Sequence, residues 1–290
     1  MEHSVHKISL YRIISVILLI LLAALFIFPL YWIITGSFKT RGEIISAVPS
    51  LFPKEWTMDN YLKLWEDKPI AWMGGTLLLA RPIAWTLNTV FICTMAMAIT
   101  CITASMAGYA LSKKEFAGKK LIFSIFICAM ALPKQVILIP LLKEMAFLRL
   151  HDTLWSVVFP TVGWPFGVFL MKQFSENIPG SILEAARIDG AGETRTFTEI
   201  VLPMIKPGIG ALAIFTFITA WNDYFMQLLM LVSRENWTIS LGIAKLQDSE
   251  AIDFGLIMAG AAIASVPIVA IFLAFQRFFT RGITMGAVKG

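Results

Sequence analysis

Long apolar runs constrain this chain more than any other feature of its sequence. Stretches of about twenty residues with few charged side chains recur along it, and each can cross a bilayer as a helix. Charged residues make up 15% of the 290 residues, whereas a soluble domain carries about 25%. Within lipid the backbone must satisfy its own hydrogen bonds, and these runs are too long and too uniformly apolar for barrel strands. The sequence therefore predicts an all-α polytopic membrane protein.

The runs predict six transmembrane helices and a simple domain organisation. The helices are expected at about 13–34, 85–111, 120–142, 153–173, 207–232 and 254–276. They form a transmembrane domain over residues 13–276, with an N-terminal segment at 1–12 and a short, flexible tail at 277–290. The first run has no small-residue cleavage site after it, which predicts an uncleaved anchor.

Lysines and arginines in the short loops predict the orientation. The N-terminal segment, the loops after the second and fourth helices, and the tail hold about three times as many as the opposite short loops. That side is predicted to be cytoplasmic, with both termini inside and the loop 35–84 outside. The same bias accounts for the net charge of +5, so no nucleic-acid partner is needed. In the outer loop, apolar residues recur on one helical face and predict an amphipathic helix: Met58, Tyr61, Leu62 and Trp65.

The cytoplasmic loop at 174–206 is polar and punctuated like a folded segment. Ser181 and Glu184 have the spacing of a capping box, which predicts the start of a short helix. Gly190 can adopt a positive φ angle and end that helix. A second short helix is predicted over 193–201, so the loop is expected to form a two-helix elbow.

The same loop carries a specific motif. Glu184-Ala185-Ala186 is followed by Gly190 and then by Ile200-x-Leu202-Pro203. This pattern, at this spacing, resembles the EAA loop of bacterial ABC importer permeases. The longer string EAARIDGAGE, Trp221-Asn222-Asp223 and the glycine-rich end of the tail resemble the carbohydrate-uptake permeases of the maltose-permease type.

The resemblance implies the ABC type I importer permease fold and a transport function. It implies the transmembrane permease subunit of an ATP-driven importer for a sugar or oligosaccharide, which is not itself an enzyme. The elbow would dock on an ATPase subunit through Glu184, Ala185, Ala186, Arg187, Asp189, Gly190 and Ala191. The tail residues Thr284, Gly286 and Lys289 would also reach the ATPase subunits.

The resemblance also implies the partners and the location. They are a second homologous permease subunit, two ATPase subunits, an extracytoplasmic solute-binding protein, a carbohydrate substrate and membrane lipid. A heterodimer of permeases is the family's usual pairing, although physics alone allows a homodimer. No GxxxxGK[ST] loop occurs in the sequence, so ATP and Mg²⁺ are assigned to the ATPase subunits and no cofactor to this chain. The three cysteines lack metal-ligand spacing, and the expected location is the bacterial inner membrane.

Ionisable residues at membrane depth mark a candidate translocation pathway. Asp223, between Asn222 and Tyr224, falls in the fifth predicted helix, and Lys134 falls in the third. Charges at this depth face a cavity or a partner. Asp223 has two open interpretations, interhelical packing and the lining of a sugar pathway. Lys134 also has two, extension to the outer interface and a cavity cation that favours an acidic saccharide.

Three other functions are alternatives. The EAA-like motif alone also fits an ABC permease for a non-sugar solute, although the Trp-Asn-Asp and the tail argue for sugars. An ion-coupled secondary transporter would predict internal repeats, and none is evident in the sequence. An intramembrane enzyme would need a motif such as HExxH or a nucleophile–base pair, and the sequence has neither.

Overall fold

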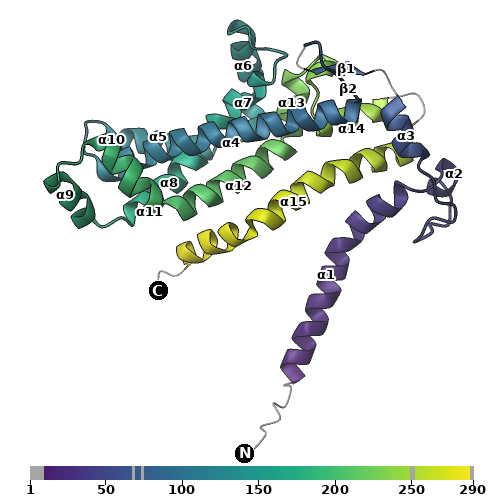
Figure 1. The fold of residues 1–290 in the computed structure, drawn as a ribbon, viewed down its shortest axis with the longest axis horizontal. Coiled ribbons are helices and arrows are strands. Elements are labelled where there is room, and N and C mark those ends of the chain that lie inside the picture. Colours follow the sequence, from purple (N-terminus) through teal and green to yellow (C-terminus); the bar gives the residue numbers. More distant parts are fainter. Residues whose placement is uncertain (1–9, 67–68, 73–74, 249–251, 288–290) are drawn as a thin grey trace, which may run out of the picture. The chain divides into compact units, whose positions relative to one another are not determined.

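The described part of the chain is mostly helical, as Figure 1 shows. The computed structural model describes residues 10–66, 69–72, 75–248 and 252–287, with only the backbone described for residues 10, 66, 248 and 275–287. It divides into two compact units, residues 1–67 with 243–265 and residues 68–242 with 266–290. The all-α expectation is confirmed, apart from one short pair of strands.

The first unit gathers its loops around the end of one long helix. It contains α1 (Leu10–Gly36), α2 (Arg41–Ile44) and α3 (Asp59–Glu66), and α15 (Phe254–Ala287) begins in it. The Asn60 amide donates to the carbonyls of Ser37 (2.8 Å) and Lys39 (2.9 Å). These bonds satisfy carbonyls that lie beyond the end of α1. Asp253, just before α15, pairs with Lys63 at 3.5 Å.

The amphipathic helix predicted in the outer loop is present as α3, and the side chains that it buries are not those of its apolar face. α3 buries Asn60 and Leu64, whereas Met58, Leu62 and Trp65 are exposed. The physical reason is the pair of hydrogen bonds from Asn60, which turns that polar residue inward together with Leu64, four positions later.

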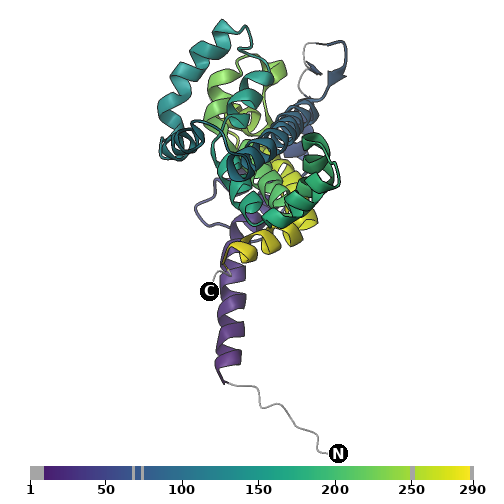
Figure 2. The ribbon, with the colours of Figure 1, turned by 90° about the vertical axis from the view of Figure 1, so that its left-hand side faces the viewer.

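Three helices form the centre of the second unit. α4 (Arg81–Lys113), α8 (Phe166–Glu176) and α12 (Lys206–Asn222) lie against one another, and Figure 2 shows them nearly end-on. Gly108 marks the closest approach, because a Cβ there would lie 2.6 Å from the backbone N of Lys172 and C of Met171. Small residues allow this approach between membrane helices.

Shorter elements surround these three helices. They are α5 (Lys119–Met130), α6 (Lys134–Phe147), α7 (Trp155–Val162), α13 (Tyr224–Met230), α14 (Ile239–Lys245) and the antiparallel strands β1 (Ile70–Ala71) and β2 (Leu78–Leu79), which pair Ile70 with Leu79. One apolar cluster joins α4, α6, α7 and α13 around Ile92, Met145, Val157 and Met230. A second joins α4, α8 and α12 around Ala104, Met171 and Leu212.

Several predicted spans are broken. Among the described residues, three helices are long and apolar enough to cross a membrane, or up to five if each bent pair is one span. The third predicted span is α5 and α6, bent by 107°, with Pro133 at the break. The fourth is divided into α7 and α8, and the fifth is interrupted at Asp223. Proline cannot donate to the helix ladder, which explains the breaks beside Pro133 and Pro165.

The end of the chain also differs from the prediction. α15 continues to Ala287, so the tail expected to be flexible from residue 277 is helical over most of its length. Each glycine lowers the stability of a helix by about 1 kcal/mol relative to alanine. The cost of Gly282 and Gly286 is not large enough to end the helix, because the residues around them are compatible with it.

Candidate functional site

The polar loop folds as the predicted elbow. Its first helix is α9 (Gly180–Ile188), and a second helical segment contains α10 (Glu193–Arg195), a π-helix (Thr196–Val201) and α11 (Leu202–Met204). The second segment extends past the predicted end at Val201. Pro203 cannot donate to the carbonyl four residues earlier, and the helix widens into a π segment just before it.

The start of α9 differs from the prediction, whereas its end agrees with it. The predicted capping box is absent: Pro179 occupies the N-cap, and no side chain caps the helix. The helix begins earlier than predicted because proline fixes a suitable entry angle. At the other end, Gly190 has a φ of +75°, Ala191 N–H donates to Ala186 O (2.9 Å), and Gly190 N–H donates to Arg187 O (3.0 Å). This is a Schellman motif, and it fixes the turn as the sequence predicts.

The elbow has an inner and an outer face. Ala186 is buried, and Leu183 packs against the cluster that joins α4, α8 and α12. Glu184, Ala185, Arg187 and Asp189 are exposed. Ile188 is 86% exposed, an unusual position for a large apolar side chain at the end of a polar helix. The sequence analysis missed Ile188, although an isolated Ile among charged residues was a usable signal.

A charged network ties the elbow to the end of α4. Glu193 accepts hydrogen bonds from the Lys114 ammonium and from Tyr109 Oη (3.5 Å), and Arg187 Nη2 lies 3.9 Å from its carboxylate. Tyr109 also packs against Phe197, with ring centroids 5.6 Å apart. The Lys114 hydrogen bond holds the pKa of Glu193 below its ordinary value. The sequence analysis missed Glu193 as an anchor, because its partner lies far away in sequence.

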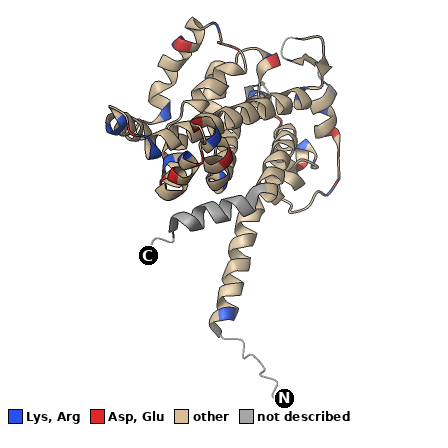
Figure 3. Cartoon of the chain, turned by 60° about the vertical axis from the view of Figure 1, so that its left-hand side comes forward, with Lys and Arg blue, Asp and Glu red and all other residues tan. Residues whose placement is uncertain are grey.

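Charges gather at this end of the second unit. Figure 3 shows blue and red residues around the elbow, whereas the long helices of the unit are mostly tan. Close to the elbow, Lys113 donates to the carbonyls of Glu176 (3.1 Å) and Ile178 (2.6 Å), which caps the end of α8. The end of α4 therefore holds both the end of α8 and, through Lys114, the elbow.

Loss of the Glu193 anchor should loosen the elbow. A carboxylate with a lowered pKa contributes stability that is present above its ordinary pKa of 4.5 and is lost as the pH falls through the lower folded value. Because Glu193 is mostly exposed, its contribution is at most about 1 kcal/mol. Hydrogen exchange of the elbow amides should show protection that decreases below pH 4.5 in the wild type. Glu193→Gln should show the lower protection already at pH 7. Equal protection in the two proteins at pH 7 would contradict this role.

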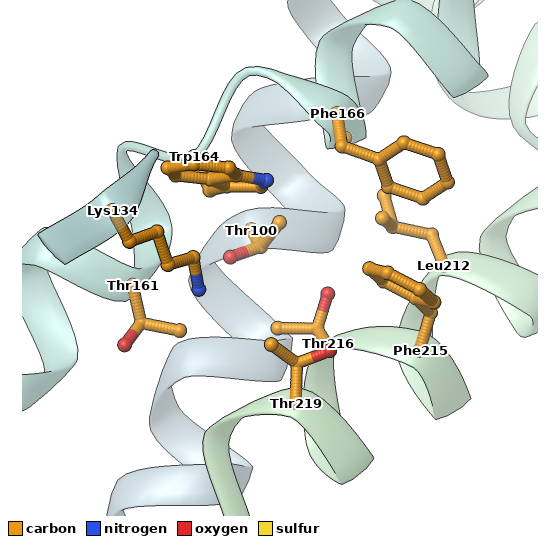
Figure 4. Close-up of a pocket in the computed structure, with 10 residues that line it drawn as sticks. Thr100, Lys134, Thr161, Trp164, Phe166, Leu212, Phe215, Thr216 and Thr219 are labelled. Carbon is orange, nitrogen blue, oxygen red and sulfur yellow. The ribbon is translucent and has the colours of Figure 1, made fainter. Parts of the chain in front are cut away.

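A cavity lies between the helices of the second unit (Figure 4). The space within it that a water molecule can occupy is about 20 Å³. Four threonines line it, namely Thr100 of α4, Thr161 of α7, and Thr216 and Thr219 of α12. Aromatic rings line it as well, Trp164 between α7 and α8, Phe166 of α8 and Phe215 of α12. The wall thus combines hydroxyl groups with flat apolar surfaces.

Lys134 enters this cavity from the start of α6. Its Nζ lies 3.5 Å from Asp223 Oδ2 and 4.6 Å from the centroid of the Trp164 ring. The structure therefore brings Lys134 and Asp223 together, although 89 residues separate them. It does not bring Asn222 and Tyr224 into the cavity wall: Asn222 donates to Ile218 O (2.9 Å), and Tyr224 packs against the α4–α6–α7–α13 cluster.

The predicted tail residues lie at the end of the chain, in and beyond α15. Thr284 and Gly286 belong to the last turns of α15, where only the backbone is described, and Lys289 lies outside the described residues.

Asp152 is a further residue whose role the sequence analysis missed. Its carboxylate accepts from the backbone N–H groups of Val232 (2.8 Å) and Ser233 (2.9 Å) and from the Ser233 hydroxyl. Partial burial raises the pKa of Asp152, but these hydrogen bonds outweigh that effect and place it below its ordinary value. Asp152 therefore fixes the segment after α13 to the start of the α7 region.

Comparisons with known proteins agree with this architecture. The family described as "Binding-protein-dependent transport system inner membrane component" matches residues 99–285. The chain is 31% identical over 284 residues to the arabinooligosaccharides transport system permease protein AraQ of Bacillus subtilis, covering 97% of each chain. It is 30% identical over 280 residues to the diacetylchitobiose uptake system permease protein NgcG of Streptomyces coelicolor, covering 95% of this chain and 88% of that one.

A solved structure has the same fold. It is a bacterial ABC transporter involved in the import of the acidic polysaccharide alginate, with a TM-score of 0.78 and 20% identity, and the match covers 96% of this chain and 100% of that chain. The family match includes the elbow and the residues that line the cavity. The chain therefore belongs to the family of binding-protein-dependent transport system inner membrane components, which are transport permeases and not enzymes.

Proposed function

We propose that this chain is the transmembrane permease subunit of an ATP-driven importer that takes up a sugar or oligosaccharide. The relatives that match it over nearly their whole length are named for arabinooligosaccharide, diacetylchitobiose and trehalose/maltose transport. A solute-binding protein delivers the sugar, and separate ATPase subunits, which hold ATP and Mg²⁺, supply the energy. A second permease subunit completes the pathway, and a heterodimer is the proposed pairing.

The single observation that carries this proposal is the elbow. It is a capped, turned and anchored helix that presents Glu184, Arg187, Ile188 and Asp189 outward. An anchored helix of this kind can transmit the movement of an ATPase subunit to α4, because the hydrogen bond between Glu193 and Lys114 connects the elbow to α4. Thr284, Gly286 and Lys289 are proposed as a second contact with the ATPase subunits.

The proposed location is the bacterial inner membrane with both termini in the cytoplasm. This orientation places the elbow on the side where ATP is available, and it agrees with the excess of basic residues in the loops on that side. The apolar window of α1 is not buried by the described residues of its own unit.

Uptake by the reconstituted complex tests the function. Proteoliposomes would contain this chain, its companion permease and the ATPase subunits, with ATP inside and the binding protein outside. Arabino-, galacto- and malto-oligosaccharides and diacetylchitobiose would be supplied in turn, with amino acids as the non-sugar control. ATP-dependent uptake of at least one saccharide is expected. Uptake of an amino acid and of no saccharide would support the non-sugar alternative.

A further inference from the structure

The loop that follows α2 in the first unit exposes its apolar side chains. Single exposed apolar residues are common on a protein surface, but a group of them marks a contact with a membrane or with another protein. Six large apolar side chains between residues 45 and 58 are more than half exposed, namely Ile45, Val48, Leu51, Phe52, Trp56 and Met58. This loop therefore needs an apolar environment on its outer side.

The polar groups of the same loop are bonded inward. The carbonyl of Leu51 accepts a hydrogen bond from Tyr31 Oη (2.8 Å). The carbonyl of Ser50 accepts one from the ammonium of Lys39, whose side chain is buried. Residues 46–57 form no helix or strand, and backbone groups that leave water need partners of this kind. The loop thus directs apolar side chains outward and polar groups inward, the reverse of a loop that is surrounded by water.

Contacts with α1 place this loop at a membrane boundary. Arg12 marks one end of the apolar part of α1, and about 20 helical residues cross the hydrocarbon core. The other boundary therefore falls near Tyr31 and Trp32, and aromatic residues of these two types are enriched there. Tyr31 bonds to Leu51 and packs against Phe52, with ring centroids 5.9 Å apart. Figure 1 shows the loop after α2 lying back beside the end of α1.

α3 presents a second bare apolar surface at this boundary. Successive residues of a helix are about 100° apart, so Met58, Leu62 and Trp65 share one face. All three are exposed, and the buried Asn60 and Leu64 lie on the opposite face. The Asn60 amide bonds to carbonyls just beyond the end of α1, which places α3 beside that end. An amphipathic helix at a membrane boundary lies in the plane of the interface with its apolar face in the lipid.

We propose that residues 45–65 form an interfacial membrane anchor, whose exposed apolar side chains enter the lipid at the boundary that α1 crosses. The contacts of Tyr31 with Leu51 and Phe52 favour lipid over a soluble partner, because a protein in water does not reach the level of the acyl chains. Lys54 and Glu55 are exposed as well, and long charged side chains at this level extend to the headgroups. This inference depends on the membrane location of the chain and not on the solute, so it goes beyond the proposed function.

Photo-crosslinking identifies what covers these side chains. Phe52→benzoylphenylalanine and Trp56→benzoylphenylalanine each introduce a photoreactive aromatic residue. The complete complex would be irradiated in proteoliposomes, with solute-binding protein on both sides of the membrane, and the products would be analysed by mass spectrometry. At both positions the main product should be a phospholipid adduct, attached to the acyl chains about 5–10 Å below the headgroups. Two positions keep the test valid if one variant does not assemble.

Asp59→benzoylphenylalanine is the matched control. Asp59 belongs to the same segment and is exposed, but it lies to one side of the apolar face of α3. Its lipid adduct should therefore be a minor product. Equal lipid yields at residues 52, 56 and 59 would contradict the selective insertion of the apolar side chains.

Any other main product at residues 52 and 56 would overturn the proposal. Coupling to the solute-binding protein would make the segment a docking surface for that protein, and coupling to the second permease subunit would make it a contact between subunits. Absence of any adduct would show that the side chains face water. Solute uptake tests the proposed function separately, so the failure of one is distinguishable from the failure of the other.

Discussion

An Ile188→Glu variant should lower ATP-driven saccharide uptake by about thirtyfold, with an unchanged amount of the chain in the membrane. Ile188 is 86% exposed at the end of α9, and docking on an ATPase subunit would bury it. Central apolar residues of an interface contribute about 2 kcal/mol or more, which corresponds to about thirtyfold. A buried, unpaired glutamate would add a desolvation cost to this loss.

The comparison with Ile188→Leu controls this experiment. Leucine keeps the apolar volume, so its uptake should remain within a fewfold of the wild type. The amount of ATPase subunit that co-purifies with each variant should follow the same order as uptake. If Ile188→Glu retained full uptake and a full complement of ATPase, Ile188 would have no part in docking.

The second large effect is expected where α4 and α8 meet. Gly108→Ala places a Cβ 2.6 Å from the backbone of Met171 and Lys172. Overpacking costs about 1–3 kcal/mol, and the backbone atoms cannot move aside as a flexible side chain could. Replacing glycine by alanine stabilises a helix by about 1 kcal/mol, so the cost of the clash decides whether the substitution stabilises or destabilises the protein. With the clash at the upper end of that range, we expect a net loss of about 2 kcal/mol and a Tm lower by about 6 °C.

Gly42→Ala is the matched control for this substitution. Gly42 lies in α2, and outside its own helix no atom of the described residues lies within 4 Å of the added Cβ, so the same change should keep or slightly raise the Tm. Thermal unfolding of both variants in the purified complex would be followed by gel filtration after heating. An equal Tm for Gly108→Ala and the wild type would contradict the close α4–α8 contact.

The sequence predicted the regular features of the fold well. The first and second spans agree with α1 and α4, because long apolar runs without internal breaks define a helix in a membrane. The elbow was predicted from its turn residues, and the positive φ angle of Gly190 confirms that part. The family match supports these local predictions over residues 99–285.

The irregular features were harder to predict. Hydropathy does not distinguish a straight span from one bent by 107°, as between α5 and α6, although Pro133 was a signal for the break. The buried face of α3 depends on the carbonyls that Asn60 meets, which only the tertiary structure provides. Lys134 and Asp223 were each recognised as charges at membrane depth, and their opposite signs could have suggested the pair. The lining by Thr100 and Trp164 had no local signal.

Simultaneous measurement of ATP hydrolysis and saccharide uptake tests the central claim most directly. Proteoliposomes would contain the complex with either the wild-type chain or a chain in which residues 184–190 are replaced by a Gly-Ser sequence of equal length. We predict that wild-type uptake requires hydrolysis by the ATPase subunits and that the replacement abolishes uptake while the chain still inserts in the membrane. Uptake at the wild-type rate after the replacement, or uphill uptake without the ATPase subunits, would contradict the account.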